Sequence, residues 1–218
     1  MKIHSEGRPF ILINTAVWII VAIAVCIFSS SGILKALVAV AALFLIGVVI
    51  FFFRTPVRKV IDDPSLVGSP ADGKVVEVDK VFVKEYFDCE CTRISIFLNL
   101  FNVHITWFPT GGEVTYCKYY PGAHTFAFLP KSSEKNEHTS IVVKDENGRE
   151  VMFRQIAGIV ARRVVCYTHE GDRARQAGEA GFIKFGSRLT VLIPGDVEPL
   201  VKVGDKVKGS VTPLARLK

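Results

Sequence analysis

The chain has 218 residues, a net charge of +6, an apolar fraction of 50% and five cysteines. This length fits one domain of ordinary size plus an appendage, and the apolar fraction is high for a soluble domain. The basic balance favours an anionic partner, but the sequence has neither a basic helix nor an aromatic RNA-binding motif, which argues against nucleic acid. The odd number of cysteines argues against a disulfide framework.

Two apolar segments begin the chain, at about residues 10–28 and 33–53, and a short Ser-Ser-Ser-Gly linker joins them. Each segment is about as long as the roughly 20 residues that a helix needs to cross a hydrocarbon core. A cleaved signal peptide fits poorly, because no small-residue cleavage pattern separates the two segments. The sequence therefore predicts a hairpin of two transmembrane helices.

Basic residues flank this hairpin on both sides, namely Lys2, Arg8, Arg54, Arg58 and Lys59. Because basic flanks stay in the cytoplasm, we expect both ends of the hairpin on the cytoplasmic side of the cell (inner) membrane. The predicted organisation is a membrane anchor over residues 1–59 and a cytoplasmic domain over residues 60–218. The positive charge of the chain suits an anionic lipid surface.

From about Val67 onward, apolar residues recur with a period of two, which is typical of strands. The predicted strands cover residues 74–78, 93–98, 140–144, 151–153, 156–167, 182–185 and 189–193, with Gly- and Pro-containing turn signals between them. Helical periodicity is confined to one or two turns within residues 173–180. The pattern predicts a mainly β domain with curved sheets.

Two segments of this domain resemble each other. Residues 170–175 are Glu-Gly-Asp-Arg-Ala-Arg, and residues 203–208 are Val-Gly-Asp-Lys-Val-Lys. Glycine permits a tight turn and aspartate closes it, and such hairpins recur in lipoyl- or biotinyl-like barrel sandwiches. Residues 69–75 resemble the opening strand of the same architecture. A carrier domain would also need a modifiable lysine at a hairpin tip, and none is evident.

The apolar run of residues 181–194 is interrupted by Phe185-Gly186-Ser187-Arg188. One interpretation is a β-bulge at Gly186 with an incidental serine. A hydrolase elbow does not fit, because it needs Gly-x-Ser-x-Gly between a strand and a helix. The third interpretation is a self-cleaving bond, in which the Ser187 hydroxyl attacks the Gly186 carbonyl, unshielded by any Cβ. Ser187 would then become a pyruvoyl group.

Three other motifs precede this segment, in the order Ser69-Pro70-Ala71-Asp72-Gly73, Phe97–His104 and Glu134-Lys135-Asn136-Glu137. Behind an N-terminal membrane anchor, this series resembles the short, bacterial and archaeal type of phosphatidylserine decarboxylase. The resemblance covers the chain from about Arg54 to the C-terminus.

The resemblance implies cleavage between Gly186 and Ser187 into a large β subunit (1–186) and a small α subunit (187–218). The two pieces would stay together as a heterodimer, and a higher oligomer is left open. The implied cofactor is the covalent pyruvoyl group, and no metal is expected. The amine of phosphatidylserine would form a Schiff base with this group, lose CO₂ and leave as phosphatidylethanolamine.

On this resemblance, His104 is the candidate proton donor. Asp72 could orient His104 or help to activate Ser187, by the logic of a catalytic triad. Asn136 and Glu137 could shape the site.

One departure from the family pattern concerns self-cleavage. Larger members carry a second histidine three positions after the first, assigned as the cleavage base, and here that position is Trp107. Either His104 serves both steps, or another group such as His169 or His138 serves one of them.

Two other functions stay open on the sequence alone. The Gly-Asp segments also fit a membrane-tethered β-barrel adaptor or carrier-like domain without catalysis. A pyruvoyl enzyme for a soluble amino acid is the other alternative, although a tethered active site favours a lipid substrate. Cys89 and Cys91 could hold zinc, but no second ligand pair follows at the usual spacing.

Overall fold

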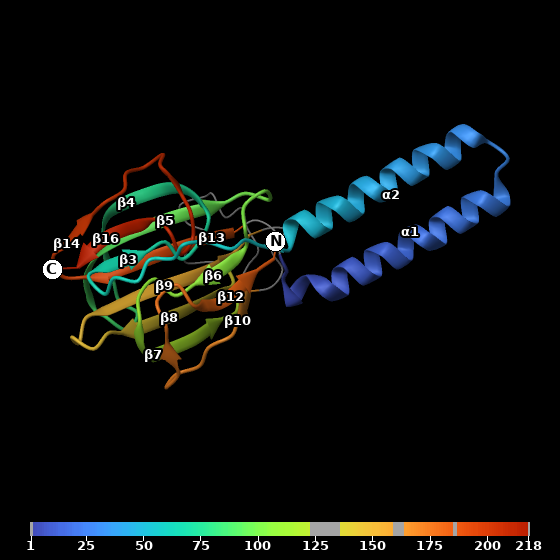
Figure 1. Cartoon of the computed structure of the whole chain (residues 1–218). Helices are drawn as coiled ribbons and strands as arrows, with labels where there is room; N and C mark the ends of the chain where they lie inside the picture. The colour runs from blue at the N-terminus through green and yellow to red at the C-terminus, as the bar shows by residue number, and fades with distance from the viewer. Residues whose placement is uncertain (1, 123–135, 159–163, 185–186, 218) are drawn as a thin grey trace. The chain divides into compact units, whose positions relative to one another are not determined.

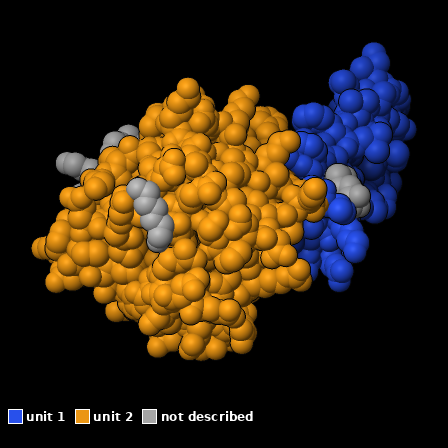
Figure 2. Space-filling model, turned by 60° about the vertical axis from the view of Figure 1, so that its left-hand side comes forward, with its two compact units in different colours: residues 1–57 blue, residues 58–218 orange. Residues whose placement is uncertain are grey.

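The computed structural model describes residues 2–122, 136–158, 164–184 and 187–217. The chain forms two compact units, residues 1–57 and residues 58–218 (Figure 2).

The first unit is a hairpin of two antiparallel helices, α1 (Arg8–Phe28) and α2 (Gly32–Phe52) (Figure 1). A 3-10 turn, η1 (Ser5–Gly7), precedes α1, and strands β1 (Lys2–Ile3) and β2 (Arg54–Thr55) pair at the base. Both helices are long and apolar enough to cross a membrane, and within their most apolar stretches no residue is buried inside the protein. The predicted pair of apolar helices is confirmed.

In the described part of the second unit, the regular secondary structure consists of strands. Its largest sheet has eight antiparallel strands in the order β11-β7-β8-β9-β13-β5-β4-β15. Their bounds are β4 Gly73–Val83, β5 Cys89–Leu98, β7 Gly112–Tyr120, β8 His138–Lys144, β9 Glu150–Ala157, β11 Arg173–Ala174, β13 Ser187–Pro194 and β15 Lys206–Val207.

Two three-stranded sheets complete the unit (Figure 1). One has the order β10-β12-β6, with β6 Ile105–Trp107, β10 Val164–Cys166 and β12 Glu179–Ile183. The other has the order β14-β16-β3, with β3 Leu66–Gly68, β14 Val197–Pro199 and β16 Pro213–Leu217. The mainly β fold with a curved sheet is as predicted.

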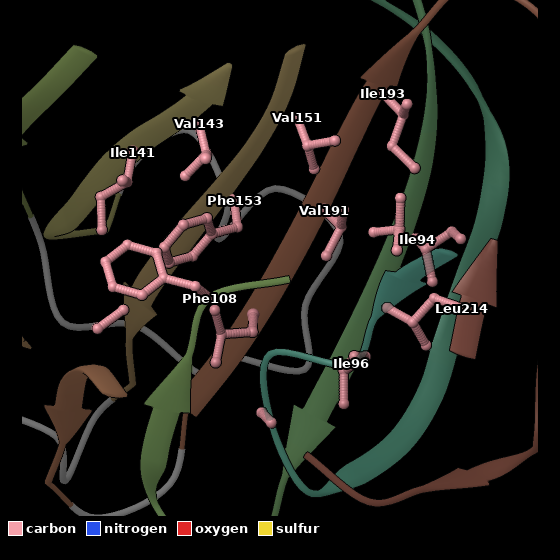
Figure 3. Close-up of a cluster of buried hydrophobic side chains, with 14 of the residues drawn as sticks. Ile94, Ile96, Phe108, Ile141, Val143, Val151, Phe153, Val191, Ile193 and Leu214 are labelled. Carbon is pink, nitrogen blue, oxygen red and sulfur yellow. The ribbon is translucent and has the colours of Figure 1, made fainter. Parts of the chain in front are cut away.

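The hydrophobic core is formed by one face of the large sheet and by side chains from both small sheets. Along β13, Leu189, Val191 and Ile193 alternate into this core, as the period of two requires. Figure 3 shows Val191 beside Phe153 of β9, and the Phe108 ring meets the Phe153 ring edge to face at 5.9 Å. The core therefore fixes which face each residue of β13 presents.

The large sheet contains an internal repeat that relates β4 and β5 to β7 and β8. Gly204 donates a backbone hydrogen bond to the Val75 carbonyl at 2.9 Å, and Gly171 donates to the Val114 carbonyl at 2.8 Å. Both glycines have positive φ, and a register shift follows both valines. The two similar Gly-Asp segments thus make equivalent turns, which lead into the two edge strands β15 and β11.

Two local predictions are wrong. Residues 156–167 do not form one strand, because β9 ends at Ala157 and β10 begins at Val164 in another sheet. Residues 173–180 contain no helical turn, since β11 leads through a tight turn at Gln176-Ala177 into β12. The backbone bond from Gly178 N to the Arg175 carbonyl at 2.9 Å closes this turn.

Candidate active site

Ser187 is the first residue of β13, a central strand of the large sheet. It faces Leu98, the last residue of β5, on one side and Ala157, the last residue of β9, on the other. The side chain is fully buried, and Oγ makes no hydrogen bond to any described residue. Packing alone does not explain such a residue, because burying a hydroxyl without a partner is unfavourable. Phe185 and Gly186 lie outside the described residues.

His104 lies on the segment that follows β5. This strand ends at Leu98, the ladder partner of Ser187. His104 is fully buried, and its carbonyl accepts a hydrogen bond from Ile183 N at 3.0 Å, on the segment that leads to Ser187. Its Nδ1 lies 2.9 Å from the Asn102 carbonyl. Because a carbonyl can only accept, Nδ1 donates the proton of this bond, and in the neutral form of the ring the lone pair would then be on Nε2.

A buried polar pair links the segment that carries His104 to the strand that pairs with Ser187. Gln155 Nε2 donates to Thr106 Oγ1 at 3.0 Å, and both side chains are fully buried. His104 lies just before β6, and its carbonyl extends the pairing of β6 with β12 through the hydrogen bond from Ile183 N. Because side chains alternate along an extended chain, Thr106 shares a face with His104. By the same rule, Gln155 shares its face of β9 with Ala157, the partner of Ser187. Our sequence analysis missed this pair, whose only signal is a polar residue within each apolar strand.

Asn136 and Glu137 bind Ala157, the last residue of β9, which pairs with Ser187. The Asn136 side-chain amide donates to the Ala157 carbonyl at 2.8 Å, and Ala157 N donates to the Glu137 carbonyl at 2.9 Å. The Glu137 carboxylate also accepts from Val164 N, the first residue of β10, at 3.3 Å. The structure therefore brings both predicted residues next to the Ser187 position.

Asp72 lies two strands away from Ser187, just before β4. Its carboxylate accepts two hydrogen bonds from Arg58, at 2.6 and 2.7 Å, and one from Gly209 N at 2.8 Å. Among the described residues these are its hydrogen-bond partners, so no bond to His104 or Ser187 is formed. The Arg58 guanidinium also lies over the Trp107 ring, 5.1 Å from its centroid. Asp72 is thus linked to the strand that follows His104 through Arg58 and Trp107.

His169 is remote from this interior. It lies in the turn before β11, at the edge of the large sheet, and its side chain is 87% exposed. Its backbone N donates to the Asp172 carboxylate at 2.8 Å. The structure does not bring it together with Ser187.

His138 lies on the outer face of the large sheet. It lines a cavity of about 700 Å³ together with Thr190 and Leu192 of β13, whereas the neighbouring Leu189 points into the core. Ser187 shares the core face with Leu189, because the two are separated by one residue. The His138 ring stacks on Tyr120, with ring centroids 4.8 Å apart. Burial lowers the pKa of His138.

Arg188 follows Ser187 in β13. Its side chain is 2% exposed and reaches across β5 to the Glu77 carboxylate of β4, with contacts of 3.2 and 3.3 Å. Burial lowers the pKa of Arg188, while the charge of Glu77 opposes that shift. This ion pair fixes the start of β13 on the outer face of the sheet.

No group of three or more His, Cys, Asp or Glu side chains gathers at metal-binding distance in the part of the chain that the structure describes. The Cys89 and Cys91 sulfurs lie 4.0 Å apart. Burial raises the pKa of Cys91 to about 12, which disfavours the thiolate form that zinc binds.

Comparison with known proteins identifies the family of this chain. A family model described as phosphatidylserine decarboxylase matches residues 45–215. The chain belongs to that family. The match extends from α2 to β16 and includes every candidate residue named above. The resemblance that we identified from the sequence motifs is therefore confirmed.

Relatives in the phosphatidylserine decarboxylase family match along the whole chain. The phosphatidylserine decarboxylase proenzyme of Parabacteroides distasonis is 40% identical over 218 residues, covering 100% of this chain and 99% of that protein. The proenzyme of Syntrophus aciditrophicus is 42% identical over 212 residues, covering 97% of this chain and 96% of that protein. Amoebophilus asiaticus has a proenzyme that is 40% identical over 220 residues, with coverage of 100% and 97%.

Proposed function

We propose that this chain is a proenzyme that cleaves itself between Gly186 and Ser187 and then decarboxylates phosphatidylserine to phosphatidylethanolamine. Cleavage would give a β subunit of residues 1–186 and an α subunit of residues 187–218 that begins with a pyruvoyl group. The observation that carries the proposal is the fully buried Ser187 Oγ, which has no hydrogen-bond partner among the described residues. The family membership supports the same substrate.

The proposed cleavage uses only the chain and one water molecule. Ser187 Oγ attacks the Gly186 carbonyl carbon and His104 Nε2 takes the hydroxyl proton, so that the amide becomes an ester. Loss of the α-proton of residue 187 then expels the Gly186 carboxylate. The remaining enamine takes up water and releases ammonia, which leaves a ketone at the new terminus.

The interior around Ser187 fits this group. The small subunit would not diffuse away, because β13 lies between β5 and β9, and β16 lies between β14 and β3. Its residues Leu189, Val191 and Leu214 are fully buried in the core, so release would expose a large apolar surface. Burial also keeps bulk water from the position of residue 187.

The pyruvoyl ketone would supply an electron sink that accepts the substrate amine and draws in the electron pair of the bond that loses CO₂. His104 would then deliver a proton to the substrate carbon. Asn136 and Glu137 would hold Ala157 and, with it, the position of residue 187. Asp72 would act as a positioning residue for His104, through the contacts that link it to Arg58 and Trp107.

The membrane hairpin supports a lipid substrate. Both α1 and α2 are long and apolar enough to span a bilayer. We propose that the basic flanks place residues 58–218 on the cytoplasmic side. The catalytic unit would then remain near the inner leaflet, where its substrate lies.

Mass spectrometry of the purified chain, followed by an activity assay, tests the proposal. We expect two pieces that meet at Gly186/Ser187, of which the smaller resists Edman sequencing and reacts with hydroxylamine. A single intact chain would favour a non-catalytic adaptor. The assay compares phosphatidylserine with free serine and aspartate, and CO₂ release from a free amino acid alone would favour a soluble substrate.

A further inference from the structure

The turn between β5 and His104 presents two adjacent apolar side chains to solvent. Leu100 is 51% exposed and Phe101 is 75% exposed. We define residues 99–102 as the apolar tip, and we propose that the apolar tip inserts into the interface of the lipid bilayer beside the active site. The proposal rests on the proposed function, because it concerns how a site for a membrane lipid meets its substrate.

Hydrogen bonds within the apolar tip hold its backbone in shape. Asn102 N donates to the Asn99 carbonyl at 3.1 Å, and Asn99 N donates to the Asn102 side-chain oxygen at 2.9 Å. The Asn99 side-chain oxygen in turn accepts from Phe101 N at 2.9 Å. These bonds satisfy the backbone N–H groups of Asn99, Phe101 and Asn102, which lowers the cost of moving the turn into a region poor in water. The turn therefore displays Leu100 and Phe101 without having to rearrange.

The apolar tip is continuous with the site on both sides. Leu98, just before it, is the ladder partner of Ser187, and His104, just after it, binds the Asn102 carbonyl through Nδ1. Insertion of the apolar tip would therefore set the distance of Ser187 and His104 from the bilayer. A helical anchor alone does not fix that distance, since it constrains only the start of the catalytic unit.

Positive charge near the apolar tip favours an anionic lipid surface as the partner that the tip contacts. Lys74 and Lys206 are ladder partners, and both are exposed. Lys74 also pairs with Phe97, the residue before Leu98, so the two lysines lie at the end of β5 that leads into the apolar tip. Exposed apolar side chains close to lysines are the pattern of a protein surface that sits in a headgroup layer.

Phe82 provides a matched control. It is also exposed, at 61%, but it lies near the far end of β4, opposite Glu90. Phe82→Trp and Phe101→Trp thus place the same probe at two ends of the same sheet.

The test uses the full chain reconstituted in vesicles of phosphatidylcholine and phosphatidylserine with bromine atoms at defined acyl depths. After subtraction of the signal of the native tryptophans, we expect shallow bromines to quench Phe101→Trp and to leave Phe82→Trp unchanged. Iodide in the aqueous phase should quench Phe82→Trp more strongly than Phe101→Trp. Equal behaviour of the two variants overturns the proposal. Protection of Phe101→Trp from both quenchers also overturns it, because the occupant would then be protein, such as a second copy of the chain.

Activity gives a second, independent measurement. For Leu100→Ser/Phe101→Ser, the ratio of activity on vesicle phosphatidylserine to activity on short-chain dispersed phosphatidylserine should fall about tenfold, by loss of apolar burial. Phe82→Ser should keep the ratio of the unaltered chain. An unchanged ratio in the double variant overturns the proposal. The quenching result does not require decarboxylation, so a failure of the proposed function would be recognised separately.

Discussion

The two halves of the large sheet pair their strands in the same way but connect them differently. In one half, β8 and β9 form a hairpin that closes at Asp145–Arg149. In the other half, β5 and β13 pair with equivalent register, and Leu98 and Ser187 take the places of Asp145 and Arg149. No turn joins them, because the chain leaves β5 toward His104 and enters β13 from β12.

The closed hairpin satisfies its own polar groups. The Asp145 carboxylate accepts hydrogen bonds from Asn147 N, Arg149 N and Arg149 Nε at 2.7 to 2.9 Å. At the equivalent place in the other half, Ser187 Oγ has no hydrogen bond to a described residue. The comparison shows how a repeated sheet can make room for a candidate site: an open strand pair admits two other chain segments and leaves the Ser187 hydroxyl without a hydrogen bond to any described residue.

Loss of Ser187 should have the largest effect. Ser187→Ala should leave one chain of 24.1 kDa and no measurable decarboxylation, because no nucleophile and no ketone can form. Its thermal stability should hardly change, since Oγ makes no hydrogen bond to a described residue. Intact mass and thermal unfolding in detergent measure both effects.

Asp145→Ala is the matched change in the closed half. It should cleave completely, yet lose roughly 1–3 kcal/mol of stability, because buried backbone N–H groups lose their acceptor. Complete cleavage of Ser187→Ala, or failure of Asp145→Ala to cleave, would contradict the assignment of the site to the open half.

His104→Ala should slow self-cleavage on the order of 10²–10⁴-fold, the usual contribution of a positioned base. Uncut precursor should accumulate in a time course followed by gel electrophoresis. His138→Ala serves as the control and should cleave at the normal rate, since His138 lies on the outer face of the sheet. Should His104→Ala cleave normally but fail to decarboxylate, His104 acts only as the later proton carrier.

The sequence predicted the strands that alternate clearly, and it failed where the alternation is hidden or where nothing marks the end of a strand. Residues 93–98 and 189–193 were recognised, because their apolar side chains alternate into one core. β7 (Gly112–Tyr120) was missed, since Lys118, Tyr119 and Tyr120 hide its period of two. Residues 156–167 were joined into one strand because a long apolar run carries no signal of where its strands change sheet.

The site followed the same rule. The proposed cleavage bond at Ser187 could be named from the sequence because its chemistry needs a specific pair of adjacent residues. The partners of Asp72 could not, since Arg58 and Gly209 meet it only after β4 pairs with β15. The polar pair of Gln155 and Thr106 depends in the same way on the packing of β6 against the large sheet.

The ion pair of Arg188 and Glu77 lies in the half of the sheet where no turn joins β5 and β13. It tests whether a buried charge pair holds the start of β13 in place. Glu77→Gln should destabilise the protein by roughly 3 kcal/mol, because it leaves a buried guanidinium without full charge compensation. Glu90→Gln, which removes the exposed partner of Lys80, should cost less than about 1 kcal/mol. Thermal unfolding in detergent compares the two. Equal losses would show that the start of β13 does not depend on this pair.

His138 should produce the smallest effect, in the dependence of stability on pH. His138 pairs with Tyr120 across the sheet. In the other half of the sheet, the equivalent pair is Cys91 and Val81. Burial lowers the pKa of His138 below 6.5, so on acidification the unfolded chain takes up the proton before the folded one. Stability from this residue is therefore complete above pH 6.5 and is lost as the pH falls toward the pKa of the folded state. His138→Gln should flatten the fall in melting temperature between about pH 7 and pH 5. An unchanged slope would mean that protonated His138 is accommodated in the cavity, and that the two halves differ there in shape rather than in charge.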